Sequence, residues 1–392
     1  MKTRRGARFA AEASFRFGIE EEYFLCDAAT LAPAMRTPES MFKARKGAQL
    51  HREMLQIQAE VNTRAHTTQH GIRNELIELR NTAACAAAGH GLAIAACGTH
   101  PTAHWREGVH SRKERYRALM QDLQLVAQRD MVCGMHVHVE LPDPDRRVNV
   151  MTRLIPYVPL LLALSTSSPF WCSQDSGLKS YRLTAYDELP RSGLPELFWS
   201  HGDYESFVSA LVSSGAIADA SHIWWALRPS CTYPTLELRA PDCCTHVDDA
   251  VAIAALYRAL VRYLYRNPTV NADINAVDRS IAVENKWIAQ RYGVEGSFVT
   301  PAGAVTVAEM LDQLIEQLAD DSEMLGCARE MLACRAIVTR GTSADAQLRV
   351  FRQHRNDGLS PLDAVVRWIA EASTSESTQS GCEGRSDFGQ RS

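Results

Sequence analysis

Four short stretches of the chain alternate between apolar and polar residues over most of their length, and this feature constrains the fold more than any other. The stretches are 15–25, 55–61, 135–141 and 235–239. Successive side chains of a β-strand point to opposite faces, so each stretch predicts a strand that buries one face and presents polar groups on the other. Taken alone, each is equally typical of a half-exposed antiparallel strand with a solvated outer face.

The polar faces of these four strands are acidic and include two imidazoles. Their members are Glu20, Glu22, Glu60, His136, His138 and Glu237. If the strands are neighbours in one sheet, these carboxylates converge, and like charges within about 4–6 Å raise one another's pKa and oppose folding. Cations relieve that repulsion, and oxygen ligands with one or two imidazoles suit Mg²⁺ or Mn²⁺. The pattern therefore predicts a metal-dependent, phosphate-handling surface.

The familiar phosphate-binding and hydrolytic motifs are absent. There is no GxxxxGK[ST], GxSxG or HExxH, and GHGLAIAACG at 89–98 lacks the third glycine of GxGxxG. The HxH pair His136 and His138 would suit zinc by itself, although the surrounding carboxylates favour a harder metal. Cationic side chains that suit a carboxylate or a phosphate are also present. They are Lys179 and Arg182, which follow a glycine turn, and Arg239, which lies beside Glu237. An ordinary surface position is the alternative for each of them.

Composition excludes several classes of protein. Of the 392 residues, 46% are hydrophobic and 22% charged, which excludes a collagen, a coiled coil or bulk disorder. The formal net charge of −4 gives no basic field for nucleic acid or an anionic membrane. The eleven cysteines are scattered without a CxxC pair, which favours reduced thiols and a cytoplasmic protein. The most apolar stretch, 158–164, is shorter than the roughly 20 residues of a membrane span.

The remaining periodicity predicts helices and one large domain. Helical spacing of apolar residues occurs over 112–128, 251–265 and 308–320, and an Ala- and Leu-rich helix is expected over 75–98, broken near Gly89 and Gly91. We expect an N-terminal arm, a single folded domain and a C-terminal tail of low apolar content. Their predicted bounds are 1–13, 14–372 and 373–392.

Nine segments in order resemble the carboxylate–amine ligase family that contains the type 2 glutamate–cysteine ligases. They are FGIEEEYFL, MLQIQAEVNT, GTHP, CGMHVHVEL, SPFW…GLKSYR, LPRSGLP, TLELRAPD, ENKWIAQRYG and GTSADAQ. The resemblance covers residues 14–371. It implies an α+β, glutamine-synthetase-like fold. In that fold a curved, mainly antiparallel sheet has helices on its convex side and the active site on its concave face. It also favours a homodimer.

The resemblance also implies a reaction and a set of site residues. Such ligases use ATP and Mg²⁺, or Mn²⁺, to activate an amino-acid carboxylate, by default the γ-carboxylate of glutamate, as an acyl phosphate. An amine, by default that of cysteine, then displaces phosphate. The implied metal ligands are Glu20, Glu22, Glu53, Glu60, His136 and Glu237. Arg182 and Arg239 are implied to act in catalysis and, with Lys179, to bind the nucleotide.

One of the implied metal ligands requires a particular backbone path, and two further residues are placed near the site. Glu53 disagrees in parity with Glu60 and therefore requires a bulge or a separate loop. His138 and Glu140 are expected behind the metal ligands or beside the substrate.

Two alternatives to a ligase stay open at this point. One is a zinc- or manganese-dependent hydrolase built on His136 and His138. The other is a non-catalytic family member that binds an amino acid or a nucleotide.

Overall fold

A seven-stranded antiparallel sheet organises the part of the chain that the structure describes. The structure is a computed structural model that describes residues 14–42, 49–111, 113–355 and 360–375. The strands of the sheet are β1 (Phe17–Asp27), β2 (Leu50–Arg52), β3 (Gln58–Asn62), β4 (Leu92–Ala95), β5 (Met135–Glu140), β8 (Leu227–Pro229) and β9 (Thr235–Leu238). Their order is β2-β3-β1-β5-β9-β8, with β4 paired to the far end of β1. The four predicted strands are therefore neighbours, as the site prediction requires.

The strand register places the predicted polar residues side by side. Glu22 of β1 lies opposite Glu60 of β3, and Glu20 lies opposite His136 of β5. On the next strand, Glu237 of β9 lies opposite His138. Because strand side chains alternate, paired positions share a face, so this register puts all these polar groups on one face of the sheet.

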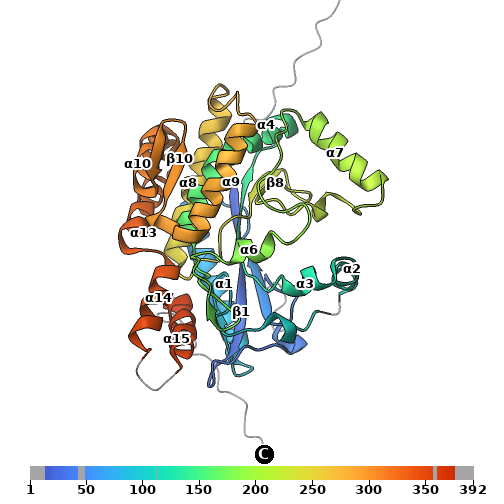
Figure 1. Cartoon of the computed structure of the whole chain (residues 1–392), viewed down its shortest axis with the longest axis vertical. Helices are drawn as coiled ribbons and strands as arrows, with labels where there is room; N and C mark the ends of the chain where they lie inside the picture. Colours follow the sequence, from blue (N-terminus) through green and yellow to red (C-terminus); the bar gives the residue numbers. More distant parts are fainter. Residues whose placement is uncertain (1–13, 43–48, 112, 356–359, 376–392) are drawn as a thin grey trace, which may run out of the picture.

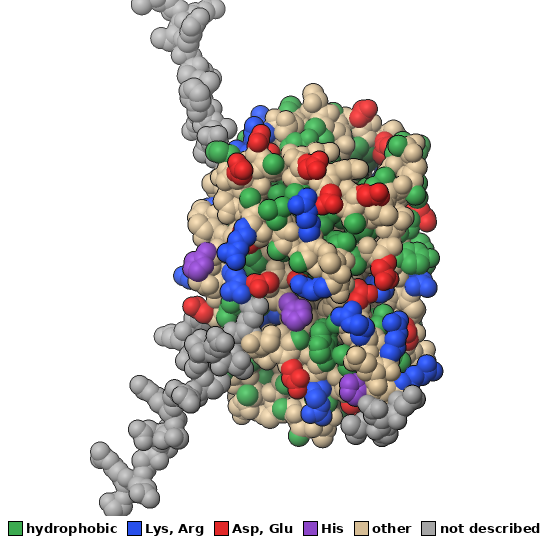
Figure 2. All heavy atoms as spheres, turned by 90° about the vertical axis from the view of Figure 1, so that its left-hand side faces the viewer, with side chains coloured by type: hydrophobic (Ala, Val, Ile, Leu, Met, Phe, Trp, Pro, Cys, Tyr) green, Lys and Arg blue, Asp and Glu red, His purple; other side chains and the backbone are tan. Residues whose placement is uncertain are grey.

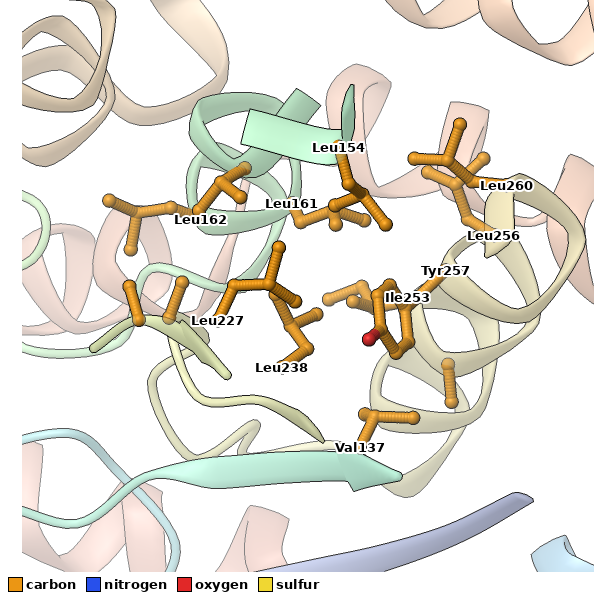
Figure 3. Packing of buried hydrophobic residues seen from close by; sticks show 14 of the residues in the cluster. Val137, Leu154, Leu161, Leu162, Leu227, Leu238, Ile253, Leu256, Tyr257 and Leu260 are labelled. Carbon is orange, nitrogen blue, oxygen red and sulfur yellow. The ribbon is translucent and has the colours of Figure 1, made fainter. Parts of the chain in front are cut away.

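The opposite face of the sheet is apolar and carries the main core. Figure 3 shows Val137 and Leu238 of the sheet packed beneath Leu161 of α5 (Val158–Ser165) and Ile253 of α8 (Val247–Arg266). Helix α8 is buried along most of its length, as its nearly all-apolar sequence predicts. Helix α1 (Gln69–Ala88) packs beside α8 and against β3 and β4. The apolar face is thus covered by helices.

The remaining elements surround this sheet. In Figure 1, α10, α13, α14 and α15 lie on one side of β1, and α2, α3 and α7 lie on the other. The further α-helices are α2 (Glu114–Leu123), α3 (Leu125–Arg129), α4 (Pro144–Leu154), α6 (Arg182–Tyr186), α7 (His201–Ser213), α9 (Ala276–Tyr292), α10 (Val307–Gln317), α11 (Ala319–Met324), α12 (Ala328–Leu332), α13 (Cys334–Arg340), α14 (Ser343–Gln353) and α15 (Pro361–Thr374). Two short hairpins pair β6 (Phe170–Trp171) with β7 (Gln174–Asp175) and β10 (Ser297–Thr300) with β11 (Gly303–Thr306).

Two helix predictions need correction. The helix expected over 75–98 ends at Ala88, and residues 92–95 form β4 instead, after Gly91 adopts a φ of 69°. Pairing with β1 decides that segment, because Ile94 and Ala95 become buried in the sheet. The helix expected over 112–128 is divided into α2 and α3 at Gln124, whose φ of 51° cannot continue a right-handed helix. The helices expected at 251–265 and 308–320 are present, the second as α10 followed by α11.

The apolar face also contains a buried carboxylate, that of Glu21, which the alternating pattern did not predict. Glu21 points into the core with no exposed surface and forms an ion pair with Arg80 of α1 at 2.6 Å. Arg80 additionally donates to the carbonyl oxygens of Cys244 and Thr245, and Tyr23 donates to Glu21. Because the buried charges are mutually satisfied, this network fastens α1 to β1 and to the chain before α8.

The predicted boundaries can be compared with the structure over part of their length. The segment 144–165, formed by α4 to α5, is long and apolar enough to cross a membrane, but 83% of its most apolar window lies inside the fold, as in a core helix. At the C-terminus, α15 continues through Thr374, and the Ser373 side chain is buried and donates to the carbonyl of Ile369. The ranges 1–13 and 376–392, predicted as arm and tail, lie outside the described residues.

The surface in Figure 2 carries acidic and basic side chains interspersed, on the face formed by the left-hand side of Figure 1. This mixed distribution agrees with the small net charge.

Candidate active site

Two cavities open against the polar face of the sheet and meet at Glu20 and Glu60, which line both. The wide cavity, of about 620 Å³, is lined by the start of β1, the end of β3 and the turn before β9. The narrow cavity, of about 270 Å³, lies between the polar face and α2, α3 and α6. Five of the six predicted metal ligands line the narrow cavity: Glu20, Glu22, Glu53, Glu60 and His136.

Glu20 is held between two imidazoles. Its Oε2 lies 3.3 Å from Nδ1 of His136, and its Oε1 lies 3.2 Å from Nε2 of His138. Burial opposes ionisation of Glu20, but the hydrogen bonds from the two histidines outweigh it and keep the pKa of the carboxyl well below its usual range. Burial, assisted by the positive charge of Arg239, lowers the pKa of His136 to about 4. His136 is therefore a neutral imidazole, and its buried Nε2 has no hydrogen-bond partner.

Glu22, Glu53 and Glu60 form a tight acidic group. One carboxylate oxygen from each lies within 4.8 Å of the others. Burial, reinforced by the charge of Glu53, raises the pKa of Glu22 to about 8. Burial, together with a hydrogen bond and charge repulsion from Glu53, also raises the pKa of Glu60 well above its usual value. Mutual repulsion of this kind is what a bound cation would relieve.

Glu53 reaches this group from outside the strand pattern. It lies in the connection between β2 and β3, where its carboxylate accepts the backbone N–H of Met54 at 2.7 Å. Strand β3 begins only at Gln58, three residues later than the alternating stretch suggests. A separate loop therefore resolves the parity conflict.

Glu237 is oriented differently from the other predicted ligands. Its Oε2 accepts Nε of Arg228 at 2.8 Å, and its Oε1 is paired with Nη1 of Arg239. Burial opposes its ionisation, but these two guanidinium groups outweigh that effect and lower the pKa of Glu237. The structure thus places Glu237 behind the cavity wall as the anchor of two arginines.

Arg182 and Arg239, which were predicted to act in catalysis and to bind the nucleotide, both line the narrow cavity. Arg182 Nη1 donates to the carbonyl oxygens of Arg239 at 3.1 Å and Ala240 at 3.2 Å. Its guanidinium lies against Gly134, where an added Cβ would come within 2.2 Å of Nη2. Arg239 donates to Glu237 and, at 3.0 Å, to the hydroxyl of Tyr186. The Nε of each arginine is buried and has no partner.

Lys179 does not join the site. Its ammonium is paired with Asp345 at the start of α14 and lies 3.5 Å from Glu295, and it lines neither cavity. The physical reason is that Lys179 precedes Ser180, whose hydroxyl donates to the buried Asp242, and this anchors the loop with Lys179 facing α14. His138 and Glu140 line the wide cavity.

Sequence reasoning missed three residues of the narrow cavity. Arg228 lies in a strand of three residues, too short for an alternation signal, and Tyr186 follows Arg182 by one helical turn. Asp130 lies in the connection from α3 to β5. Its Oδ1 is buried without a partner, and burial raises its pKa to about 7. No local sequence pattern predicts that Asp130 reaches the cavity, because this depends on how distant segments of the chain pack together.

Comparisons with known proteins match most of the chain to one family. A family model described as glutamate-cysteine ligase family 2 (GCS2) matches residues 16–365. A relative from Bradyrhizobium sp. (strain ORS 278), provisionally named glutamate–cysteine ligase 2, is 55% identical over 364 residues, covering 92% of this chain and 88% of the relative. One from Rhodospirillum rubrum with the same provisional name is 43% identical, covering 91% of this chain and 94% of the relative.

Solved structures confirm the fold class. The glutamate–cysteine ligase of Francisella tularensis, solved in complex with AMP, superposes with a TM-score of 0.70 at 11% identity, covering 94% of this chain and 90% of that one. A bifunctional glutathione synthetase from Pasteurella multocida gives 0.67 at 13% identity, covering 93% of this chain and 53% of that one. The predicted α+β fold, with its large antiparallel sheet, is therefore confirmed.

Proposed function

The chain belongs to glutamate–cysteine ligase family 2, and from this premise we propose that it is an ATP-dependent ligase joining the γ-carboxylate of glutamate to the amine of cysteine through an acyl phosphate. The observation that carries the proposal is the acidic wall shared by two cavities. Residues far apart in the sequence, Glu20, Glu60 and His136, meet where the wide and narrow cavities join. An enzyme that transfers a phosphoryl group from a nucleotide to a carboxylate needs two anionic substrates to meet at one place.

The acidic group fits a divalent cation. Three carboxylates within 4.8 Å, two of them with raised pKa values, make an oxygen-rich set that Mg²⁺ or Mn²⁺ would stabilise. Glu22, Glu53 and Glu60 would hold one ion, and Glu20 with Nε2 of His136 offers further donors. When bound, such ions neutralise charge on phosphate oxygens.

We assign the nucleotide to the wide cavity. Its volume of about 620 Å³ lies within the range of ordinary small-molecule pockets. Tyr233 and Pro234 offer exposed apolar surface to a base. Arg16 and Arg64 also line this cavity, paired with Glu140 and Glu75. This placement brings the phosphates of ATP toward Glu20 and Glu60, where the two cavities meet.

The narrow cavity suits the amino-acid substrates. It is small, at about 270 Å³, and the unpartnered Nε groups of Arg182 and Arg239 are donors for a carboxylate or a phosphate. Arg239 is fixed by Glu237 and Tyr186, so its charge is oriented before substrate arrives. A preoriented positive group of this kind stabilises negative charge that develops on the transferring phosphoryl oxygens without reorganisation. No side chain of the protein needs to act as a nucleophile.

The direct test measures turnover and the product. With ATP, Mg²⁺, glutamate and cysteine, the protein should release phosphate and form a dipeptide of the corresponding mass, and omission of either amino acid should abolish dipeptide formation. The Glu53→Gln variant should lose at least 100-fold in kcat/KM, because it removes one charge from the acidic group. Glu323→Gln, at an exposed position on α11, is the charge-matched control and should retain activity. Absence of any dipeptide across a panel of acceptor amines would refute the ligase proposal.

The two alternatives make different predictions. A hydrolase built on His136 and His138 would contain tightly bound zinc and act without ATP, whereas the structure directs both imidazoles at Glu20. A non-catalytic binding protein would retain amino-acid binding after Glu237→Ala. Under the ligase proposal this change releases Arg228 and Arg239 and abolishes metal-dependent use of ATP.

We also propose a cytoplasmic homodimer. Eight cysteines of the described residues form no disulfide bond, in keeping with a reducing compartment; they are Cys26, Cys97, Cys133, Cys172, Cys243, Cys244, Cys327 and Cys334. Light scattering of the purified protein tests the dimer.

A further inference from the structure

Asp130 is an ionisable residue of the narrow cavity that has no role in the proposed reaction. It follows α3 directly and lines the cavity with Ala127 and Val132. Its Oδ1 is buried and has no hydrogen-bond partner. Leaving a buried polar atom without a partner costs about 1–3 kcal/mol, and more for a charged one. An unpaired carboxylate oxygen at a substrate cavity therefore points to a ligand that supplies the missing donor.

The nearest cations of the protein do not supply it. Arg182 and Arg239 both act on Asp130 electrostatically, but their hydrogen bonds go elsewhere. Arg182 donates to two backbone carbonyls, and Arg239 donates to Glu237 and Tyr186. Both arginines nevertheless keep a buried, unpartnered Nε–H. The cavity therefore contains two guanidinium donors and one carboxyl oxygen that have no partner in the protein. A ligand with both a carboxylate and an ammonium group would pair with the donors and with the acceptor.

The ionisation of Asp130 agrees with this complementarity. Burial raises the pKa of its carboxyl to about 7, while the two arginines oppose that rise. An ammonium group that arrives within hydrogen-bond distance favours the carboxylate and lowers this pKa. Binding of an ammonium group would therefore favour the ionised form of Asp130.

The chemistry of the two amino acids decides which ammonium fits. The amine of the acceptor has to be neutral when it attacks, and a fixed carboxylate beside it would stabilise the unreactive ammonium form. The α-ammonium of the donor takes no part in the reaction and keeps its proton throughout. We propose that Asp130 binds the α-ammonium group of the donor amino acid and so makes the enzyme specific for an α-amino acid over a simple dicarboxylate. This inference rests on the proposed ligase function.

Binding measurements test the inference independently of turnover. Isothermal titration with Mg²⁺ and a non-hydrolysable ATP analogue would compare L-glutamate with glutarate, which lacks only the amino group. The wild-type protein should bind glutamate about 10- to 100-fold more tightly, the range expected for a charge-assisted hydrogen bond. Asp130→Asn, which keeps the shape of the side chain, should remove this preference and leave glutarate binding unchanged. The KM for cysteine should also stay unchanged.

A matched control and the contrary outcomes complete the test. Glu188 also raises the pKa of Asp130 by its charge, but it pairs with Arg129 and lies outside the lining of the narrow cavity. Glu188→Gln should therefore keep the preference for glutamate. Equal binding of glutamate and glutarate by the wild-type protein would overturn the inference without any variant. So would an Asp130→Asn variant that weakens both ligands equally, or one that affects only cysteine. If the preference depends on Asp130 but no dipeptide is ever formed, the ligase proposal fails and the binding role of Asp130 stands.

Discussion

The Gly134→Ala substitution tests whether the position of the Arg182 guanidinium limits activity. Gly134 directly precedes β5, and its backbone N–H donates to Glu22 at 2.6 Å. A Cβ added here would lie 2.2 Å from Nη2 and 2.7 Å from Cζ of Arg182. Since such approaches do not occur below 3.0 Å, the guanidinium has to move by about 1 Å. A displacement of that size at a substrate-positioning group costs about 100-fold in rate.

The same shift also weakens the fold. It strains the hydrogen bonds from Arg182 to the carbonyl oxygens of Arg239 and Ala240. Hydrogen bonds from charged donors contribute about 1.5–3 kcal/mol each, so we expect the free energy of unfolding to fall by about 2–4 kcal/mol. Urea unfolding followed by circular dichroism measures this loss, and phosphate release at saturating ATP measures kcat and the KM of each amino acid.

Gly202→Ala is the control for this experiment. Gly202 lies in the exposed first turn of α7, where an added Cβ meets only Ser200 Oγ at 3.8 Å. This change should be neutral or stabilising by up to about 1 kcal/mol, because alanine favours a helix. If Gly134→Ala keeps kcat/KM per folded molecule within threefold of the wild type, the idea that Arg182 positions substrate is wrong, whatever happens to stability.

Three further predictions follow from the described contacts. Glu21→Gln should lower the free energy of unfolding by about 3–5 kcal/mol, measured in urea, because it leaves the buried charge of Arg80 unpaired, while activity per folded molecule stays unchanged. Mg²⁺ binding should release protons below pH 8, because the pKa of Glu22 is raised to about 8 and a metal ligand has to be deprotonated. The affinity for Mg²⁺ should therefore rise with pH up to that value, and titration calorimetry in buffers of different ionisation enthalpy would count the released protons. An affinity that does not depend on pH would contradict the assignment of Glu22 as a ligand. Lys179→Met should lower stability by about 1–3 kcal/mol by breaking the pair with Asp345, yet leave the KM for ATP unchanged, and a KM raised tenfold would restore the role first expected for Lys179.

Much of the site follows from local sequence because strand geometry is local. The alternation around Glu20, Glu60 and His136 fixes which face each side chain occupies once a strand forms, whatever the strand pairs with. Motif order then identified the family, which the comparisons confirm.

What the sequence left open depends on pairing and on loops. The segment at 92–95 has helical composition, but hydrogen bonding to β1 makes it β4, and this overrides its local preference. Lys179 carries the right charge for ATP, yet the loop anchored on Asp242 turns it toward Asp345.

The sequence by itself determined the acidic strand faces and the family, because both depend on residue order along a few neighbouring positions. Only the tertiary structure decided that Glu53 completes the acidic group from a loop and that Glu237 anchors two arginines. It alone also revealed that the buried Oδ1 of Asp130 has no hydrogen-bond partner beside the cavity. These roles depend on distances between separate segments, which are set by how the sheet pairs and how the helices pack on it.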